Sequence, residues 1–460
     1  EGWRLANPED AKAAMAALLG GSGPRIEGEN IFGLPNGHGP VRIVATEAPV
    51  PGDAETLVYH AKRYALGLGC ARGCDAAEMQ ALVTRTLEAA GIAPGAVACV
   101  VSLDLKADES AVIETARWLD VPLRLFSAAE LEAEVARLAN PSEVVFAEVG
   151  CHGVAEGAAL AAAGAGAELV VPKVKSANAT CALARADTPI TEMPGRARGR
   201  LSLVGIGPGR AAWRTPEATR AIAGADELVG YGLYIDLLGP LAAGKPRRDF
   251  PLGGEEDRCR HALERAGEGR DVALVCSGDA GIYAMGALVF ELLDRDASAG
   301  GVSAAARRVE VVTAPGISAL QAAAARAGAP LGHDFCAISL SDLLTPREDI
   351  LRRVRAAADG DFVVAFYNPV SKRRRTLLAA ARDILLAHRP AETPVLLAAS
   401  LGRDGESLRY VRLDALSVDD VDMLTVVLVG ASTSRLTALG EGPRMYTPRG
   451  YGRKIGGGSG

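Results

Sequence analysis

Three glycine-rich turns, each lying between an apolar strand pattern and a helix pattern, constrain the fold of this chain more than any other feature. The apolar segments Leu201–Ile206, Asp271–Cys276 and Val309–Thr313 are typical of strands buried on both faces of a sheet. A turn with several glycines or a Pro-Gly pair follows each of them. Because parallel strands end at one edge of a sheet, we expect the three turns to form a ligand site together.

The first turn, Leu203-Val-Gly-Ile-Gly-Pro-Gly209, is glycine-rich like a dinucleotide-binding loop but departs from it at two positions. The dinucleotide fingerprint needs a further glycine at position 210, where this chain has Arg210. Pro208 also removes a backbone N–H that a pyrophosphate would use. The turn therefore lets a ligand approach closely without cradling a phosphate, which disfavours an oxidoreductase.

The first half of the chain shows the same alternation of strands and helices. Strand patterns at Ala65–Gly69 and Val97–Leu103 enclose a helix pattern at Ala76–Ala90, which predicts parallel βαβ units. The predicted fold class is α/β, with an N-terminal α/β domain followed by a two-lobed α/β module. The predicted division is a short N-terminal segment at 1–52, the first domain at 53–187, a Pro/Gly/Arg-rich linker at 188–200, the two-lobed module at 201–450 and a flexible tail at 451–460.

Composition excludes several functional classes. A net charge of -6 argues against a general nucleic-acid binder, and no apolar run reaches the roughly 20 residues of a membrane span. The 8 cysteines are scattered, and the close pair Cys70 and Cys74 has no second pair to complete a metal site, so no metal is expected. Since a signal peptide is also missing, we expect a cytoplasmic protein with reduced thiols.

Several motifs of the second half recur in a known family. Taken together, Leu203–Gly209, Gly278–Tyr283, Pro315–Ala319 and Tyr367–Ser371 resemble the tetrapyrrole methyltransferase family. The segments that narrow the resemblance to its precorrin-3B C(17)-methyltransferase branch are Pro330–Asp342, Phe366–Arg374 and Met423–Gly430. The resemblance covers about residues 200–450 and implies a two-domain fold that binds S-adenosyl-L-methionine between its halves.

The first half is similar to a second family. The segments Gly67–Cys74, Ser102–Glu109, Gly153–Leu160 and Val171–Lys175 resemble the C-terminal domain of cobalt-precorrin 5A hydrolase. The segment before residue 53 is expected to be a remnant of that hydrolase's middle region. The resemblance implies an accessory or hydrolase-like domain of the cobalamin pathway fused to the methyltransferase.

The resemblance also implies the reaction and the cofactor site. A methyl group passes from S-adenosyl-L-methionine to ring carbon 17 of precorrin-3B, with ring contraction to precorrin-4. Ring contraction requires proton transfer, for which Asp334 and Asp342 are the catalytic candidates. The expected cofactor-binding residues are Gly207, Pro208, Gly209, Gly278, Asp279, Ala280, Ile282, Tyr283, Ser318, Ala319, Tyr367, Asn368, Met423 and Thr425.

The substrate carries several carboxylates, which an acidic protein binds by concentrating cations locally. The candidates are Arg373 and Arg374, in a basic run from Lys372 that is predicted to begin a helix, together with Arg347 and Arg403. The same run is also typical of a solvated helix face, and spacing does not decide between the two interpretations.

The expected partner is the tetrapyrrole itself, as precorrin-3B or cobalt-precorrin-3. The resemblance further implies a homodimer and contact with other corrin-pathway enzymes, whereas no nucleic acid or membrane is expected. Two alternatives stay open. The chain can methylate another position of the corrin ring, because the cofactor motifs are shared among branches, or it can carry tetrapyrroles without catalysis.

Overall fold

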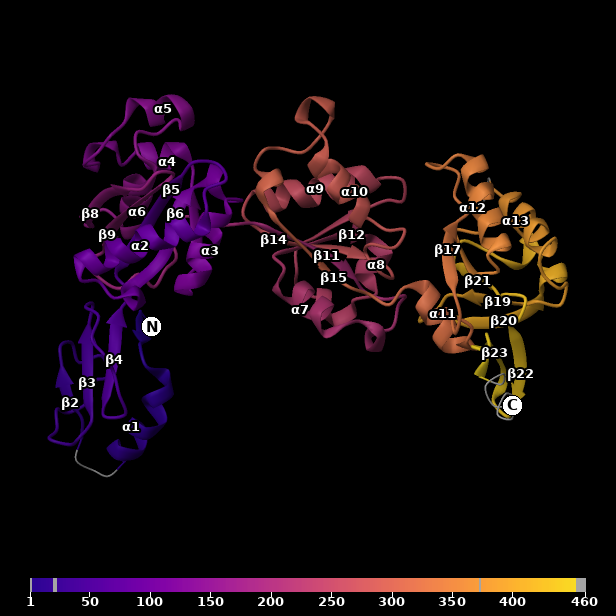
Figure 1. Cartoon of the computed structure of the whole chain (residues 1–460), viewed down its shortest axis with the longest axis horizontal. Helices are drawn as coiled ribbons and strands as arrows, with labels where there is room; N and C mark the ends of the chain where they lie inside the picture. Colours follow the sequence, from indigo (N-terminus) through magenta and orange to yellow (C-terminus); the bar gives the residue numbers. More distant parts are fainter. Residues whose placement is uncertain (1, 20–22, 372–373, 452–460) are drawn as a thin grey trace, which may run out of the picture. The chain divides into compact units, whose positions relative to one another are not determined.

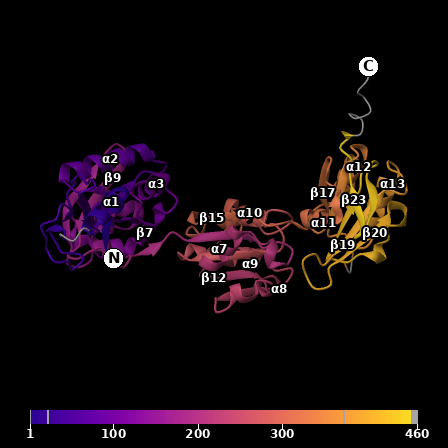
Figure 2. The ribbon, with the colours of Figure 1, turned by 90° about the horizontal axis from the view of Figure 1, so that it is seen from below.

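The computed structural model describes residues 2–19, 23–371 and 374–451 (Figures 1 and 2). It divides into two compact units. The first unit runs to Arg200, and the second begins at Leu201. Two later segments, Leu263–Arg270 and Val302–Glu310, group with the first unit. Helices and strands alternate in both units, so the predicted α/β class is confirmed.

A small four-stranded sheet opens the first unit, in the order β1-β4-β3-β2. Its elements are β1 (Trp3–Leu5), α1 (Ala11–Leu18), β2 (Arg25–Glu27), β3 (Arg42–Thr46) and β4 (Thr56–Ala61). Because β4 pairs with both β1 and β3, this sheet continues to Ala61. The predicted boundary after residue 52 is therefore too early: the Pro/Gly stretch there connects two paired strands of one sheet.

The larger sheet of the first unit has six strands in the order β10-β7-β6-β5-β9-β8. They are β5 (Tyr64–Cys70), β6 (Val97–Leu103), β7 (Leu123–Phe126), β8 (Glu168–Lys175), β9 (Ala179–Arg185) and β10 (Arg196–Ala197). Strands β5, β6 and β7 run parallel, as βαβ units require.

Helices cover both faces of this sheet. Leu66 and Leu68 of β5 pack with α2 and α3, whereas Ala65 on the opposite face packs with α6. The helices are α2 (Ala76–Ala90), α3 (Ser110–Leu119), α4 (Ala128–Glu132), α5 (Glu143–Val149) and α6 (Val154–Ala163). No single helix in the described ranges is long and apolar enough to cross a membrane, and the bent pair α5–α6 meets that test by length and composition only.

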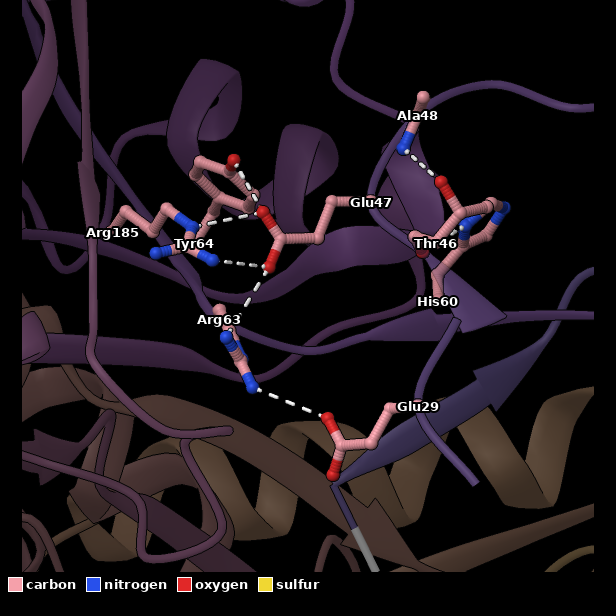
Figure 3. Close-up of polar contacts among 8 residues, drawn as sticks. All are labelled: Glu29, Thr46, Glu47, Ala48, His60, Arg63, Tyr64 and Arg185. Carbon is pink, nitrogen blue, oxygen red and sulfur yellow. Dashed lines mark hydrogen bonds and ion pairs between the residues drawn. The ribbon is translucent and has the colours of Figure 1, made fainter. Parts of the chain in front are cut away.

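A half-buried ion-pair network joins the two sheets of the first unit (Figure 3). Glu47, just after β3, accepts hydrogen bonds from Nε and Nη2 of Arg185, each at 2.8 Å, and from the Tyr64 hydroxyl at 2.8 Å. Arg63 lies 3.7 Å from the same carboxylate. Burial alone would raise the pKa of Glu47, but the hydrogen bonds from Arg185 and Tyr64 outweigh it and lower that pKa.

Replacing Glu47 with glutamine should lower the free energy of unfolding of the first unit by about 1.5–3 kcal/mol at pH 7, because two charge-assisted hydrogen bonds are lost. A lowered carboxyl pKa stabilises the fold above the unfolded value of about 4.3, and this contribution is lost as pH falls through the lower pKa of the folded state. Thermal unfolding at pH 7 and at a series of lower pH values measures both effects. The control Glu27→Gln removes an exposed pair with Arg42 and should leave the thermal stability nearly unchanged; an equal loss in both variants would contradict the prediction.

The first sheet of the second unit has the order β13-β12-β14-β11-β15. Its strands are β11 (Arg200–Gly205), β12 (Glu227–Tyr231), β13 (Arg247–Phe250), β14 (Asp271–Cys276) and β15 (Glu310–Ala314). Its helices are α7 (Pro216–Gly224), α8 (Gly232–Asp236), α9 (Glu255–Gly267) and α10 (Gly286–Asp294). Strand β12 runs parallel to β13 and β14, and Figure 1 shows α9 and α10 on one face of the sheet with α7 on the other.

The second sheet of this unit has the order β17-β18-β21-β19-β20, and a three-stranded sheet β16-β23-β22 accompanies it. The strands are β16 (Gly328–Ala329), β17 (Phe335–Ser339), β18 (Val363–Tyr367), β19 (Pro394–Ala399), β20 (Ser407–Arg412), β21 (Thr425–Val429), β22 (Arg435–Leu439) and β23 (Gly442–Tyr446). Strand β18 runs parallel to β17, and β21 runs antiparallel to β18 and β19. The carboxyl ends of β17, β18 and β19 therefore share an edge with the start of β21.

Three helices complete the second unit: α11 (Ala319–Ala327), α12 (Arg347–Asp359) and α13 (Leu377–Leu386). The predicted helix start at Lys372 is wrong, because α13 begins at Leu377. Before it, Ser371 and Arg374 exchange backbone hydrogen bonds of 2.9 and 3.2 Å, which do not follow the helical pattern. Lys372 itself lies outside the described residues.

Candidate active site

The three glycine turns meet at one edge of the first sheet of the second unit, as predicted. Gly207 and Gly278 exchange two backbone hydrogen bonds, of 3.1 and 2.9 Å, and both have positive φ angles (74° and 71°). Such φ angles favour glycine. A Cβ on Gly316 would stand 2.0 Å from the Gly278 carbonyl oxygen, so the turns are in backbone contact that only glycine allows.

The Asp279 side chain links two of these turns through hydrogen bonds. Its Oδ1 accepts a hydrogen bond from the Gly281 N–H at 2.8 Å, and its Oδ2 accepts one from the Gly316 N–H at 3.0 Å. The carboxylate therefore joins the second turn to the third. Each oxygen retains a lone pair that can accept a further hydrogen bond from a ligand.

A cleft of about 880 Å³, including its open mouth, lies beside the turns. The edge of the second sheet supplies its other wall through the residues that follow β18 and β19 and precede β21. The lining residues are Pro208, Tyr234, Ser277, Gly278, Asp279, Ile282, Tyr283, Ser318, Ala319, Tyr367, Asn368, Ser400, Leu401, Arg403, Met423, Leu424, Thr425 and Val426.

Backbone strain is concentrated in this lining. Tyr283, Asn368 and Ser400 have φ angles of 50°, 49° and 50°, a region that side chains with a Cβ rarely occupy. Residues held in such conformations cluster at ligand sites, where the surrounding structure enforces them. The strain therefore supports the cleft as a preorganised binding site.

Two tyrosines form an aromatic wall. The rings of Tyr283 and Tyr367 lie 5.1 Å apart between centroids. The Tyr367 hydroxyl accepts a hydrogen bond from the Leu320 N–H, in the first turn of α11, at 2.9 Å, and the Tyr283 hydroxyl donates one to the Ala337 carbonyl at 2.9 Å. Burial raises the pKa of both hydroxyls, so both stay protonated at neutral pH.

Most of the residues predicted to bind the cofactor line this cleft. The structure brings together Pro208, Gly278, Asp279, Ile282, Tyr283, Ser318, Ala319, Tyr367, Asn368, Met423 and Thr425. Gly207, Gly209 and Ala280 do not line it. Gly207 and Ala280 lie in the turns behind the wall, and a Cβ on Gly209 would come 2.6 Å from the Gly402 carbonyl oxygen.

The two catalytic candidates lie at opposite ends of β17. Asp334 precedes the strand, and its side chain is 77% exposed beside His333. At about 3.3 Å per residue, it stands roughly 16 Å from the end of the strand at the cleft edge, so the structure does not bring it to the site. Asp342 follows the cleft end of β17, where its carboxylate lies 3.5 Å from Arg374 Nε.

Two of the predicted substrate-binding arginines already have protein partners. Arg374 donates to the Leu340 carbonyl at 3.0 Å besides pairing with Asp342, and Arg347 donates to the Thr376 hydroxyl at 3.0 Å. Arg403 lines the cleft. Arg373 lies outside the described residues.

Six lining residues escaped the sequence analysis: Tyr234, Ser277, Ser400, Leu401, Leu424 and Val426. Ser277 directly precedes the motif that begins at Gly278, and Leu424 and Val426 lie within the Met423–Gly430 segment, so the motifs themselves point to these three residues. Tyr234 lies in α8, far along the chain from any glycine turn, and nothing local marks it. Within the described ranges, no group of three His, Cys, Asp or Glu side chains is arranged to hold a metal ion.

Comparison with known proteins identifies both parts of the chain. The family described as Tetrapyrrole (Corrin/Porphyrin) Methylases matches residues 200–417, and the family described as Cobalamin synthesis G C-terminus matches residues 64–184. Both resemblances seen in the motifs are thus confirmed.

Individual proteins agree with this result. A Precorrin-3B C(17)-methyltransferase of Sinorhizobium sp is 42% identical over 254 residues, which are 55% of this chain and 97% of the relative. A Probable cobalt-factor III C(17)-methyltransferase of Salmonella typhimurium is 45% identical over 251 residues, 55% of this chain and 99% of the relative. The crystal structure of the methyltransferase CobJ matches with a TM-score of 0.50 and 41% identity, covering 54% of this chain and all of that one. The chain therefore belongs to the tetrapyrrole methylase family and carries a cobalamin synthesis G C-terminal domain ahead of its methyltransferase part.

Proposed function

We propose that this enzyme methylates ring carbon 17 of precorrin-3B, with ring contraction to precorrin-4, or carries out the same step on cobalt-precorrin-3 with the cobalt retained, in cobalamin biosynthesis. The observation that carries the proposal is the cleft formed by the three glycine turns. Most of its lining lies within residues 200–417, which match the tetrapyrrole methylase family.

The residues of the cleft fit S-adenosyl-L-methionine. Gly278 and Pro208 leave the turn side free of bulky side chains, while Ile282, Leu401 and Met423 supply apolar surface. Asp279 offers acceptors for the hydroxyl or ammonium groups of the ligand. When bound, the cofactor supplies a methyl group on a positively charged sulfur.

The chain's own contribution is to orient the two reactants and exclude water. Holding them at attack distance is worth up to about 7–11 kcal/mol. Tyr283 and Tyr367, protonated at neutral pH, act as neutral walls for the electron-rich macrocycle. Of the two acid–base candidates, Asp342 is retained as the group that moves a proton, because it follows the cleft end of β17.

The cellular setting is proposed on the same basis. The 8 cysteines are all free thiols, which suits the reducing cytoplasm. We propose a homodimer, as the family resemblance implies, with the fused domain serving another step of the corrin pathway.

The reaction is tested by incubating the full chain with precorrin-3B and methyl-labelled S-adenosyl-L-methionine. Mass spectrometry should show one added methyl group, and NMR should place the label on carbon 17. A label on another carbon would assign the enzyme to a different branch. Binding without incorporation would favour a tetrapyrrole carrier.

The cofactor site is tested separately by Asp279→Asn. We expect affinity for S-adenosyl-L-methionine to fall by about 1–3 kcal/mol, since the amide disturbs the brace between the turns and removes the charge. Calorimetry compares it with Asp257→Asn, a change in the exposed first turn of α9. Unchanged affinity would remove Asp279 from the site.

A further inference from the structure

We infer that Arg403 is a positioning residue: it latches the loop 400–406 onto the first two glycine turns and thereby holds the cofactor side of the cleft in its binding shape. The inference rests on the proposed function. It assigns Arg403 a different task from binding the carboxylates of the tetrapyrrole.

The guanidinium of Arg403 reaches two turns at once. Its Nε donates to the Pro208 carbonyl at 2.8 Å, and its Nη2 donates to the Ser277 hydroxyl oxygen at 3.0 Å. The same group lies 5.8 Å from the centre of the Tyr234 ring. Arg403 follows β19 of the second sheet, whereas its partners follow β11 and β14 of the first sheet, so one side chain joins both walls of the cleft.

The backbone beside Arg403 fits the first turn just as closely. A Cβ on Gly209 would stand 2.6 Å from the Gly402 carbonyl oxygen and 2.7 Å from Arg403 Cγ. Gly402 has a φ of 69°, and Ser400 has a φ of 50°. The loop is therefore held in a shape with little freedom, as a docked segment requires.

Glu406 holds the other end of the loop 400–406 in place. Its Oε2 accepts a hydrogen bond from the Gly402 N–H at 2.7 Å, and its Oε1 pairs with Arg326 Nε of α11 at 2.8 Å. The Arg326 guanidinium lies 4.5 Å from the centre of the Trp213 ring, just beyond the first turn. Burial would raise the pKa of Glu406, but the Gly402 and Arg326 hydrogen bonds lower it, so the carboxylate stays charged.

These contacts decide what Arg403 does. A guanidinium binds a carboxylate best through a two-pronged fork, and here the fork formed by Nε and Nη2 already donates to the protein. The bond from Arg403 Nε helps to hold the Pro208 carbonyl, and Pro208 lines the cleft. Losing the latch should therefore distort the cofactor wall rather than the tetrapyrrole's carboxylate contacts.

Calorimetry on the full chain tests this with two probes, S-adenosylhomocysteine and 5′-methylthioadenosine, which lacks the amino-acid carboxylate. Arg403→Met should weaken both by about tenfold, and Ser277→Ala by about threefold, because each removes part of one shared contact. The double variant should be no weaker than Arg403→Met. The matched control Arg409→Lys, an exposed arginine of β20 paired with Asp420, should bind as the wild type does.

The kinetic readout separates the latch from simple destabilisation. In Arg403→Met the KM for S-adenosyl-L-methionine should rise about tenfold, while the KM for the tetrapyrrole changes less than about twofold. A loss confined to S-adenosylhomocysteine would make Arg403 a ligand of the cofactor's carboxylate and overturn the latch. A rise in the tetrapyrrole KM alone would restore the substrate-binding role. A wild-type chain that binds neither probe would overturn the proposed function instead.

Discussion

Replacing Gly316 with alanine should cost the enzyme most of its cofactor affinity. The added methyl would stand 2.0 Å from the Gly278 carbonyl oxygen and 2.8 Å from Gly205 Cα, so the three turns cannot keep their contact. Forced expansion of packed structure costs about 1–3 kcal/mol, and at the upper part of that range the affinity falls about 30- to 140-fold. Calorimetry with S-adenosylhomocysteine measures the loss.

The control for this variant is Gly224→Ala at the exposed end of α7, where an added Cβ meets nothing within 4 Å. It should bind the cofactor as the wild type does. If Gly316→Ala binds equally well, contact among the turns does not shape the cleft, and the site must be sought elsewhere.

Replacing Arg389 with methionine should destabilise the second unit by about 3–5 kcal/mol. The side chain is completely buried, yet it lies 3.6 Å from Asp361 and donates to the Gly430 carbonyl at 2.5 Å and the Phe362 carbonyl at 2.7 Å. Burial lowers the pKa of the guanidinium. Methionine fills similar space but leaves these acceptors without a donor in the core.

Urea unfolding, followed by a probe in the second unit, measures this effect. The control Arg382→Met changes an arginine of α13 whose partner Asp383 is exposed, and should cost under about 1 kcal/mol. A similar small loss for Arg389→Met would mean that water or neighbouring groups satisfy the freed carbonyls.

The cleft could be predicted because its glycine turns have a local signature. Gly207 and Gly278 adopt φ angles that favour glycine, and each follows an apolar strand at once. Residues whose position depends on distant packing have no such signature. Arg389 lies in an unremarkable His-Arg-Pro stretch, and only the fold surrounds it with carbonyl groups.

The resemblance to the methyltransferase family identified the segment Pro330–Asp342, but it did not show which end of this segment lies near the cleft. The segment Pro330–Asp342 contains the whole of β17, so its two acidic residues lie at opposite edges of a sheet. Asp342 follows the carboxyl end of β17 and pairs with Arg374, whereas Asp334 precedes the strand, and neither side chain lines the cleft. Likewise, Arg403 was predicted to bind the substrate, but its hydrogen bonds to Pro208 and Ser277 depend on strands far away in the sequence.

The residues that line the cleft lie far apart in the sequence, and this affects when the site can form during synthesis of the enzyme. Pro208 and Val426 both line the cleft, although 218 positions separate them in the chain. A ribosome-bound chain that has not yet released β21 lacks one wall, however completely its earlier domains have folded. Cofactor capture is therefore a late event in translation, and nascent chains of increasing length should gain it abruptly once β21 has left the exit tunnel.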